Sequence, residues 1–269
     1  MKTENSIYIK NVLITGGPTN EYIDEVMKIT NMSSGKIAIE MAKHFLDNGD
    51  SVTLLLTKNI KCDIEDPNFT LIRFETTEQL LKCIDEQSVN DFDIIIHSAA
   101  VGDYKPEFSF RLEDMAKEIA NKIVDTTVYR SGDHSLETRE IIQNKIFEIL
   151  KNPDCKVNDD TKISSTEPNL TVKLGLTPKI IAGLREKFPT SFICGFKLLE
   201  NVSQEELIDA AMKQINKCNT DLVFANDLAE LRKGNMERLV VSKSGYTNIN
   251  VNGAEGIFSL LDNIYFQKD

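Results

Sequence analysis

The sequence has few of the residues that build redox, metal and disulfide sites. Only three of its 269 residues are histidine, and their spacing matches no metal-ligand motif such as HExxH. The five cysteines are scattered, odd in number and form no CxxC pair. We therefore expect reduced thiols and a cytoplasmic location, and neither a disulfide scaffold nor a zinc site.

Long hydrophobic runs and an excess of positive charge are also missing. No apolar stretch is long enough to span a membrane, and residues 1–10 lack the apolar core of a signal peptide. The formal net charge of -11 repels the phosphates of nucleic acids. We therefore predict neither a membrane nor a nucleic-acid partner, although a local pocket can still bind a phosphorylated substrate.

The glycine fingerprint of dinucleotide-binding enzymes is absent too. The apolar run Asn11–Gly17 ends in two glycines, but Pro18 follows them and the next glycine is Gly35. A G-x-G-x-x-G motif would start a helix directly after the first strand. No Tyr-x-x-x-Lys pair occurs either. An NAD(P)-dependent oxidoreductase on a Rossmann-like fold is therefore an alternative and not the first interpretation.

Segments of strand and helix character alternate along the first hundred residues. Asn11–Gly17, Ser51–Thr57 and Asp93–Ser98 have the continuous apolar character of buried strands, and helical segments over Gly35–Asn48 and Thr76–Gln87 connect them. Gly49 is placed to end the first helix, and Thr77 is the candidate cap of the second. This order predicts an α/β fold, a Rossmann-like three-layer parallel sheet with helices on both faces.

The regular order breaks between residues 105 and 170 and then returns. We predict an irregular, partly mobile flap or dimerisation insertion here, with an acidic run at 158–160 and helices near Leu112–Ile123 and Leu136–Leu150. We interpret residues 1–269 as one domain that carries this insertion. The later predicted elements are helices over Pro178–Lys187 (with proline in the first turn), Gln204–Lys217 and Ala254–Phe266, strands over Ser191–Phe196 and Asp221–Ala225, and a hairpin of Arg238–Ser242 with Tyr246–Asn250.

Residues of chemical interest gather where the predicted strands end. Ligands of open parallel sheets bind beyond the carboxyl ends of the strands. Those ends are Gly16–Gly17, Ser98–Asp103, Phe196–Lys197 and Asn226–Asp227. The segment Ser33–Gly35 begins a helix, where backbone N–H groups, hydroxyls and the positive dipole end suit a phosphate. Plain capping of the helix by serine explains the same residues.

A series of short motifs lies in a fixed order along the chain. The motifs are Ile14–Thr19, Ile23–Asp24, Thr30–Lys36, Ser98–Tyr104, Lys162–Ser165, Thr177–Ile180, Gly195–Lys197 and Ala225–Asp227. This series resembles phosphopantothenate–cysteine ligase, the synthetase half of the bacterial bifunctional coenzyme A flavoprotein, and the resemblance covers nearly the whole chain except about 107–160. We expect the stand-alone form of the synthetase, without the upstream flavin-dependent decarboxylase domain, because the KISS and GFKLL segments are most similar to the stand-alone enzymes of Gram-positive bacteria.

The resemblance implies a homodimeric ligase that forms the amide between phosphopantothenate and cysteine in coenzyme A biosynthesis. A nucleoside triphosphate, with CTP expected over ATP, converts the carboxylate to an acyl-nucleotide, which the cysteine amine then attacks. Mg²⁺ is the expected ion, with its ligands left open, and no flavin is expected. Such chemistry needs cations and hydrogen-bond donors near developing charge more than a protein nucleophile.

The resemblance also assigns roles to individual residues. Asn31 matches the asparagine that contacts the acyl group, and Lys162 matches the lysine of a mobile flap over the nucleotide. Asp103 matches a position that reaches the partner subunit's site, where it binds cysteine's ammonium or magnesium. The substrate phosphate is expected at Gly17, Ser33, Gly35 and Asn226, and the nucleotide at Ala99, Ala100, Asp103, Lys162, Pro178, Lys179, Ile180, Phe196, Lys213 and Lys217.

Most of these assignments have a purely structural alternative. Asn31 can be a turn residue, Lys162 a solvated lysine, and Phe196 a core residue. Lys213 and Lys217 lie four residues apart on one predicted helix and can equally form a solvated face.

One position departs from the family pattern. The family usually carries an arginine four residues before Asn31, where this chain has Met27, with Lys28 beside it. A nucleotide-binding homologue without turnover is therefore a further alternative.

Overall fold

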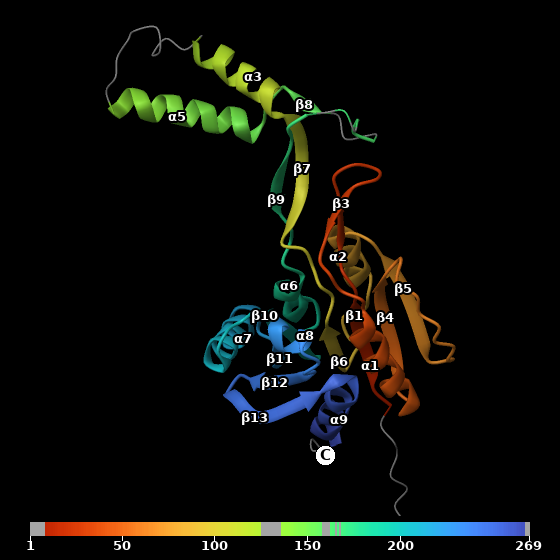
Figure 1. Cartoon of the computed structure of the whole chain (residues 1–269). Helices are drawn as coiled ribbons and strands as arrows, with labels where there is room; N and C mark the ends of the chain where they lie inside the picture. The colour runs from red at the N-terminus through yellow and green to blue at the C-terminus, as the bar shows by residue number, and fades with distance from the viewer. Residues whose placement is uncertain (1–8, 125–135, 158–161, 165, 167, 267–269) are drawn as a thin grey trace, which may run out of the picture. The chain divides into compact units, whose positions relative to one another are not determined.

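The computed structural model describes residues 9–124, 136–157, 162–164, 166 and 168–266 (Figure 1). The chain divides into two compact units. The sheet unit consists of Met1–Asn20, Thr30–Gly102 and Pro178–Asp269, and the inserted unit consists of Glu21–Ile29 and Asp103–Thr177. The inserted unit takes in the whole predicted insertion, while the assignment of the chain to a single domain stays a prediction.

A mostly parallel eight-stranded sheet forms the centre of the sheet unit, which confirms the predicted fold class. The strand order is β13-β12-β11-β10-β6-β1-β4-β5. Strands from β11 to β5 are parallel, and β12 and β13 are antiparallel. The strands are β1 (Asn11–Gly16), β4 (Ser51–Thr57), β5 (Phe69–Phe74), β6 (Ile94–His97), β10 (Phe192–Leu199), β11 (Leu222–Asp227), β12 (Glu237–Ser242) and β13 (Gly245–Asn252).

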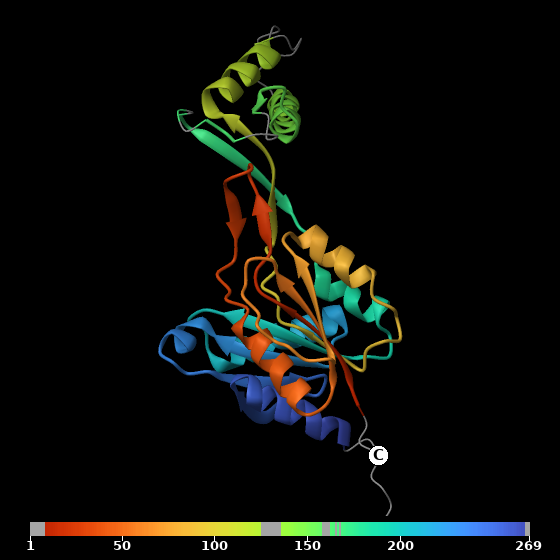
Figure 2. The same ribbon diagram turned by 90° about the vertical axis from the view of Figure 1, so that its right-hand side faces the viewer.

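Helices cover both faces of this sheet, as predicted. Helices α1 (Lys36–Asp47) and α9 (Gly253–Phe266) pack on one face. Helices α2 (Thr77–Asp85), α6 (Ile180–Lys187) and α7 (Gln204–Cys218) pack on the other. Figure 2 shows α1 and α9 on the side opposite α2 and α6. The short α8 (Leu228–Arg232) follows β11.

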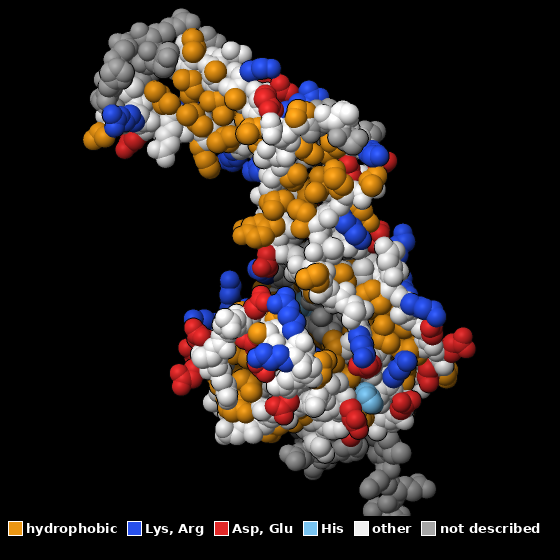
Figure 3. Space-filling view, viewed as in Figure 1, with side chains coloured by type: hydrophobic (Ala, Val, Ile, Leu, Met, Phe, Trp, Pro, Cys, Tyr) orange, Lys and Arg blue, Asp and Glu red, His pale blue; other side chains and the backbone are white. Residues whose placement is uncertain are grey.

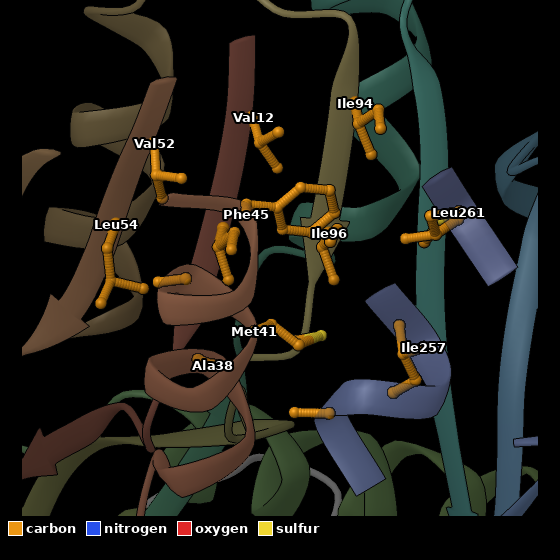
Figure 4. Packing of buried hydrophobic residues seen from close by; sticks show 14 of the residues in the cluster. Val12, Ala38, Met41, Phe45, Val52, Leu54, Ile94, Ile96, Ile257 and Leu261 are labelled. Carbon is orange, nitrogen blue, oxygen red and sulfur yellow. The ribbon is translucent and has the colours of Figure 1, made fainter. Parts of the chain in front are cut away.

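The largest core lies between the sheet and helices α1 and α9. Val12 and Ile96 from the strands, and Met41, Phe45 and Ile257 from the helices, are fully buried there (Figure 4). Because side chains alternate between the faces of a strand, alternate residues of β1, β4 and β6 join this core. The core therefore fixes which side chains continue on the same face at the end of each strand.

The structure corrects two predicted helix starts. The cap of α2 is Thr76, whose extended backbone lets its hydroxyl accept from Gln79 N at 3.1 Å, whereas Thr77 is the first helical residue. Pro178 precedes Lys179, the cap of α6, and is therefore not in the first turn. Gly49 follows the end of α1 with φ of 88°, as predicted.

The described part of the inserted unit is regular, which corrects the irregular insertion that we predicted. Strands β7 (Tyr104–Arg111), β8 (Lys156–Val157) and β9 (Leu170–Leu176) form an antiparallel sheet that the sequence did not reveal. Helices α3 (Leu112–Val124) and α5 (Leu136–Lys151) confirm the two predicted helices. The acidic run 158–160 lies outside the described residues.

A short hairpin of β2 (Asn20–Tyr22) and β3 (Lys28–Thr30) follows β1. Its turn, like the rest of Glu21–Ile29, belongs to the inserted unit. None of the described helices has the length and hydrophobicity that crossing a membrane requires.

Candidate functional site

A pocket of about 400 Å³ lies in the sheet unit at the carboxyl ends of the parallel strands. One wall is the loop before α1 and its first turns, and another is the segment that follows β6. The third wall comes from β10, β11, α8 and the start of β12. The lining residues are Met32–Ile37, Glu40, Ser98–Ala100, Phe196, Leu198, Asn226, Leu231, Met236 and Arg238.

Alternation along the strands explains why three of these side chains face the same space. Cys194, Phe224 and Val240 are buried in the core beneath α1 and α9. Residues two positions away point to the same face of a strand. At the edge where the core ends, those residues are Phe196, Asn226 and Arg238.

The start of α1 presents backbone donors to the pocket. Gly35 is the N-cap of the helix in a left-handed conformation with φ of 67°, and it has no side chain with which to cap the helix. Ser33 Oγ and Ser34 Oγ accept from Gly35 N and Lys36 N only at 3.4 Å, which is long for a hydrogen bond. The first N–H groups and the positive end of the helix dipole therefore favour an anion here.

The segment after β6 is fixed by a buried network. Thr15 Oγ1 lies 2.9 Å from His97 Nδ1 and accepts from Ala99 N at 3.2 Å, and Ser98 Oγ donates to Thr15 O at 2.7 Å. Burial lowers the pKa of His97 to about 4, so the imidazole is neutral at pH 7. The network holds the backbone of Ser98–Ala100 in place at the pocket wall.

Asn31 connects the two loops that border the pocket. Its Nδ2 donates to Ala100 O at 3.3 Å and to Val101 O at 3.1 Å. The side chain therefore holds the segment before α1 against the segment after β6. The predicted contact of Asn31 with an acyl group stays a prediction.

Six of the predicted substrate and nucleotide residues come together in the pocket. They are Ser33, Gly35, Ala99, Ala100, Phe196 and Asn226. Phe196 lines the pocket, and its ring centroid also lies 5.3 Å from that of Phe224, whereas its contact with a nucleotide stays a prediction. Gly17 is buried in a left-handed turn next to Gly35 of the pocket wall, and a Cβ on Gly17 would lie 2.4 Å from Thr57 Oγ1.

The remaining predicted nucleotide residues of the sheet unit lie on α7 or at the beginning of α6, and both helices pack on the face of the sheet opposite α1. Lys213 and Lys217 are exposed on α7, and Pro178 and Lys179 are exposed before α6. Ile180 is buried in the core beneath α2 and α6.

Two of these lysines lie near one cysteine of α7. Burial raises the pKa of the Cys218 thiol, and the charges of Lys217 and Lys179 partly oppose the shift.

Two predicted catalytic residues, Asp103 and Lys162, belong to the inserted unit and are exposed. Lys162 precedes Ile163, whose N–H donates to Asp24 Oδ2 at 2.9 Å. Asp24 Oδ1 also accepts from Val26 N at 2.7 Å and Met27 N at 2.6 Å. The bond from Met27 is the first cause of a lowered pKa for the Asp24 carboxyl. Asp24 thus anchors the lysine segment to the turn.

Asp24 and Arg238 have no role among the sequence-based predictions. Asp is a common turn residue, because its carboxylate accepts backbone N–H groups two and three residues ahead. This signal could have marked Asp24 in the sequence. Arg238 was interpreted only as part of a hairpin strand. The Met27 side chain is exposed in the turn that Asp24 holds.

Among the described residues, only single carboxylates are available as ligands for a metal ion. Within the described ranges, no group of three or more His, Cys, Asp or Glu side chains is placed to hold a metal. A magnesium ion that arrives on substrate phosphates needs only one or two protein carboxylates. Asp103 is the carboxylate that the sequence analysis offers for this purpose.

The sequence matches one family model and a set of longer proteins. Residues 8–126 and 154–251 match the model of the DNA/pantothenate metabolism flavoprotein C-terminal domain. Over 237 residues the chain is 32% identical to the coenzyme A biosynthesis bifunctional protein CoaBC of Thermococcus kodakarensis. That alignment covers 87% of this chain and 45% of the relative, so the chain spans less than half of the relative's length.

Solved structures share the fold. The DNA/pantothenate metabolism flavoprotein of Streptococcus pneumoniae matches with a TM-score of 0.74 and 29% identity, covering 97% of this chain and 100% of that one. A Cab2 variant in complex with phosphopantothenate-cysteine matches with a TM-score of 0.61 and 18% identity, covering 96% of this chain and 87% of that one. The second likeness is one of fold alone.

Proposed function

The chain belongs to the family of the DNA/pantothenate metabolism flavoprotein C-terminal domain, and on this basis we propose that it is a phosphopantothenate–cysteine ligase. The similarity to bifunctional proteins of coenzyme A biosynthesis supports this proposal. So does the fold shared with a protein that binds phosphopantothenate-cysteine. The observation that carries it is the pocket, because its walls combine phosphate-binding donors with apolar surface.

The two kinds of lining match the two ends of phosphopantothenate. The N–H groups at the start of α1 and the side chain of Asn226 suit its phosphate. Leu198 and Met236 offer apolar surface to the dimethyl group of its pantoyl part, beside Phe196, which is assigned to the nucleotide. A volume of about 400 Å³ is in the range of small-molecule sites. The carboxylate then extends towards the segment at Ala99 and Ala100.

The proposed reaction has two displacement steps. In the first, a carboxylate oxygen of phosphopantothenate attacks the α-phosphorus of the nucleoside triphosphate, and the bond to the β-phosphate oxygen breaks, which releases pyrophosphate. In the second, the amine nitrogen of cysteine attacks the acyl carbon and loses a proton. The bond from that carbon to the nucleotide oxygen breaks, and the nucleoside monophosphate leaves. We propose CTP as the nucleotide, with an acyl-cytidylate intermediate.

Residues of this chain position the reactants and balance their charge. The small side chains of Ala99 and Ala100 allow the acyl-nucleotide to approach the backbone closely. Asn31 holds that backbone through its bonds to Ala100 and Val101. Lys162 supplies a cation for the triphosphate, and magnesium, when bound to the triphosphate, neutralises further charge.

The proposal is tested by incubating the purified chain with phosphopantothenate, cysteine, magnesium and either CTP or ATP. We expect pyrophosphate release that requires phosphopantothenate, a product with the mass of phosphopantothenoylcysteine, and faster turnover with CTP. Absence of pyrophosphate with both nucleotides would eliminate the ligase. Nucleotide binding without turnover would favour the inactive homologue, and tight NADH binding would favour the oxidoreductase.

Two variants test the residue assignments within that assay. Lys162→Ala and Asn31→Asp should abolish turnover while the far-ultraviolet circular dichroism stays that of the wild type. Lys151→Ala is the matched control, because Lys151 is another exposed lysine of the inserted unit. If Lys162→Ala or Asn31→Asp turns over near the wild-type rate, its assigned role is wrong.

A further inference from the structure

Arg238 is a buried cation without a counter-charge in the described part of the chain. The residue is 6% exposed and lies at the start of β12. Its Nη1 donates to Met236 O at 2.8 Å. Its Nε has no hydrogen-bond partner among the residues that the structure describes, and its guanidinium forms no ion pair with any of them. The arginine therefore retains donors and charge that the fold does not use.

The neighbouring strands fix the position of Arg238 beside Asn226. Leu239 lies opposite Ala225 in the antiparallel pair of β11 and β12. The next position outward places Arg238 beside Asn226, towards the carboxyl end of β11. On its other side Arg238 lies opposite Val251 of β13. A residue held between two strands cannot readily leave its place on the pocket wall.

Burial of this charge is unfavourable unless a ligand compensates for it. Burial lowers the pKa of Arg238, but a guanidinium starts so far above neutrality that it stays charged at pH 7. A buried charge is normally paired or coordinated. Glu40 is the one acid of the pocket lining, and it pairs with Lys36 at 3.6 Å on the exposed side of α1. The lining thus leaves the charge of Arg238 available to an anion.

We propose that Arg238 is a phosphate-binding residue of this pocket, which acts together with the N–H groups at the start of α1 and the side chain of Asn226. A guanidinium offers planar pairs of donors that match two phosphate oxygens. The helix start and Asn226 contribute donors from two other walls. The ligand is a phosphate group, carried either by phosphopantothenate or by the nucleotide. Its identity as phosphopantothenate rests on the proposed function.

Titration calorimetry of four proteins tests the proposal. The proteins are the wild type, Arg238→Met, Arg238→Lys and the control Arg232→Met. Arg232 is exposed on the neighbouring α8 and is paired with Glu200, so its loss removes the same charge without touching the buried position. The probes are phosphopantothenate, pantothenate, CTP and inorganic phosphate.

We expect Arg238→Met to weaken phosphopantothenate binding by about tenfold to a hundredfold, as loss of a charge-assisted hydrogen bond does. Pantothenate should bind the wild type and Arg238→Met equally. Arg238→Lys should restore part of the affinity, and Arg232→Met should bind like the wild type. If CTP binding weakens instead, the phosphate belongs to the nucleotide.

The proposal is overturned if Arg238→Met binds phosphopantothenate, CTP and inorganic phosphate as tightly as the wild type. Calorimetry needs no turnover, so this outcome differs from a failure of the ligase assay. If Arg238→Met does not fold, wild-type crystals soaked in phosphopantothenate decide the question. A phosphate within hydrogen-bond distance of the Arg238 guanidinium supports the proposal, and a phosphate bound elsewhere overturns it.

Discussion

His97 stays uncharged because the fold surrounds it at the end of β6. Its ring is buried and contacts the hydroxyl of Thr15, and burial lowers its pKa from 6.5 to about 4. In the unfolded chain the imidazole titrates at its ordinary value. Between these two values the unfolded chain binds a proton that the folded chain does not bind, so folding becomes weaker as the pH falls.

We predict a loss of stability between pH 8 and pH 5 that depends on His97. The stability that the neutral imidazole contributes is complete above pH 6.5 and decreases as the pH falls towards 4. At pH 5 this decrease amounts to roughly 2 kcal/mol. Urea unfolding of the wild type and His97→Gln at both pH values measures it. The wild type should lose about 2 kcal/mol more than the variant. An equal loss in both proteins would contradict the assignment.

A second residue-scale prediction compares two glycines with positive φ. A Cβ at Gly35 would lie 2.8 Å from Ile60 Cδ1 and 3.1 Å from Leu56 Cδ1, whereas a Cβ at Gly49 has no atom within 4 Å. Both alanine variants bear the backbone strain, but only Gly35→Ala must also move its neighbours. Gly35→Ala should lower the free energy of unfolding by roughly 1–3 kcal/mol more than Gly49→Ala in urea. Equal losses would show that the close approach is unimportant.

A residue of the pocket could be predicted from the sequence where a local motif marks it. Ser33, Gly35 and Asn226 follow predicted strand ends or begin a predicted helix, and the structure places all three in the pocket. Arg238 was not predictable, because an arginine in a hairpin strand usually lies at the surface. Its burial depends on α1 and β11, which are distant in sequence and meet it only in the folded sheet.

At the scale of elements, the pattern of apolar residues decided which helices and strands could be predicted from the sequence. Helix α1 was located because its apolar residues follow the helical period, and strand β4 because its apolar residues form a continuous run. Strands β7 and β9 were missed because each is only partly buried, and β7 contains Pro106 together with Lys105 and Glu107. Their pairing with each other supplies the order that their sequences do not show.

Asp24 gives the element-scale prediction. Its carboxylate joins the 23–27 turn to the segment at Ile163, and backbone donors lower its pKa below 3.8. The stabilisation is therefore present above that ordinary value and lost as the pH falls through the lowered one. Asp24→Ala should increase amide hydrogen exchange at Ile163 and reduce turnover, because Lys162 is adjacent.

The matched control for Asp24 is Asp66→Ala. Asp66 also accepts from a backbone donor, Asn68 N at 2.8 Å, but it lies in the sheet unit. Its loss should leave the exchange of Ile163 unchanged. If Asp24→Ala also leaves that exchange unchanged, the proposed anchor has no effect on the lysine segment.

At the scale of the whole molecule, the acidic chain contains a pocket that favours an anion. The formal net charge is -11, yet the start of α1 and Arg238 both favour an anion in the pocket. A local arrangement of donors can thus oppose the average charge. The net charge of the sequence could not locate the pocket, because it does not show where donors gather in the fold.

The inserted unit exposes large hydrophobic side chains, which supports the proposed homodimer. Leu136 and Phe147 on α5 and Leu176 on β9 are exposed, and Figure 3 shows hydrophobic side chains gathered over these elements. Exposed apolar side chains that gather on one face are typical of protein interfaces. We propose that a second copy of the chain covers it.

Light scattering after size exclusion tests the dimer. The wild type should elute with twice the mass of one chain, and Phe147→Glu should raise the dimer dissociation constant by roughly 30-fold or more, because it places a charge in an apolar interface. Val89→Glu, which alters an exposed hydrophobic residue of the sheet unit, should remain dimeric. A monomeric wild type, or a Phe147→Glu dimer of unchanged affinity, would contradict the proposal.

The fate of the substrate carboxylate oxygens tests the central claim most directly. Phosphopantothenate labelled with ¹⁸O in its carboxylate is incubated with the chain, cysteine, magnesium and CTP, and the products are analysed by mass spectrometry. An acyl-nucleotide intermediate predicts that one labelled oxygen appears in CMP and the other stays in the amide product. Unlabelled CMP, or label in pyrophosphate or inorganic phosphate, would contradict the proposed mechanism.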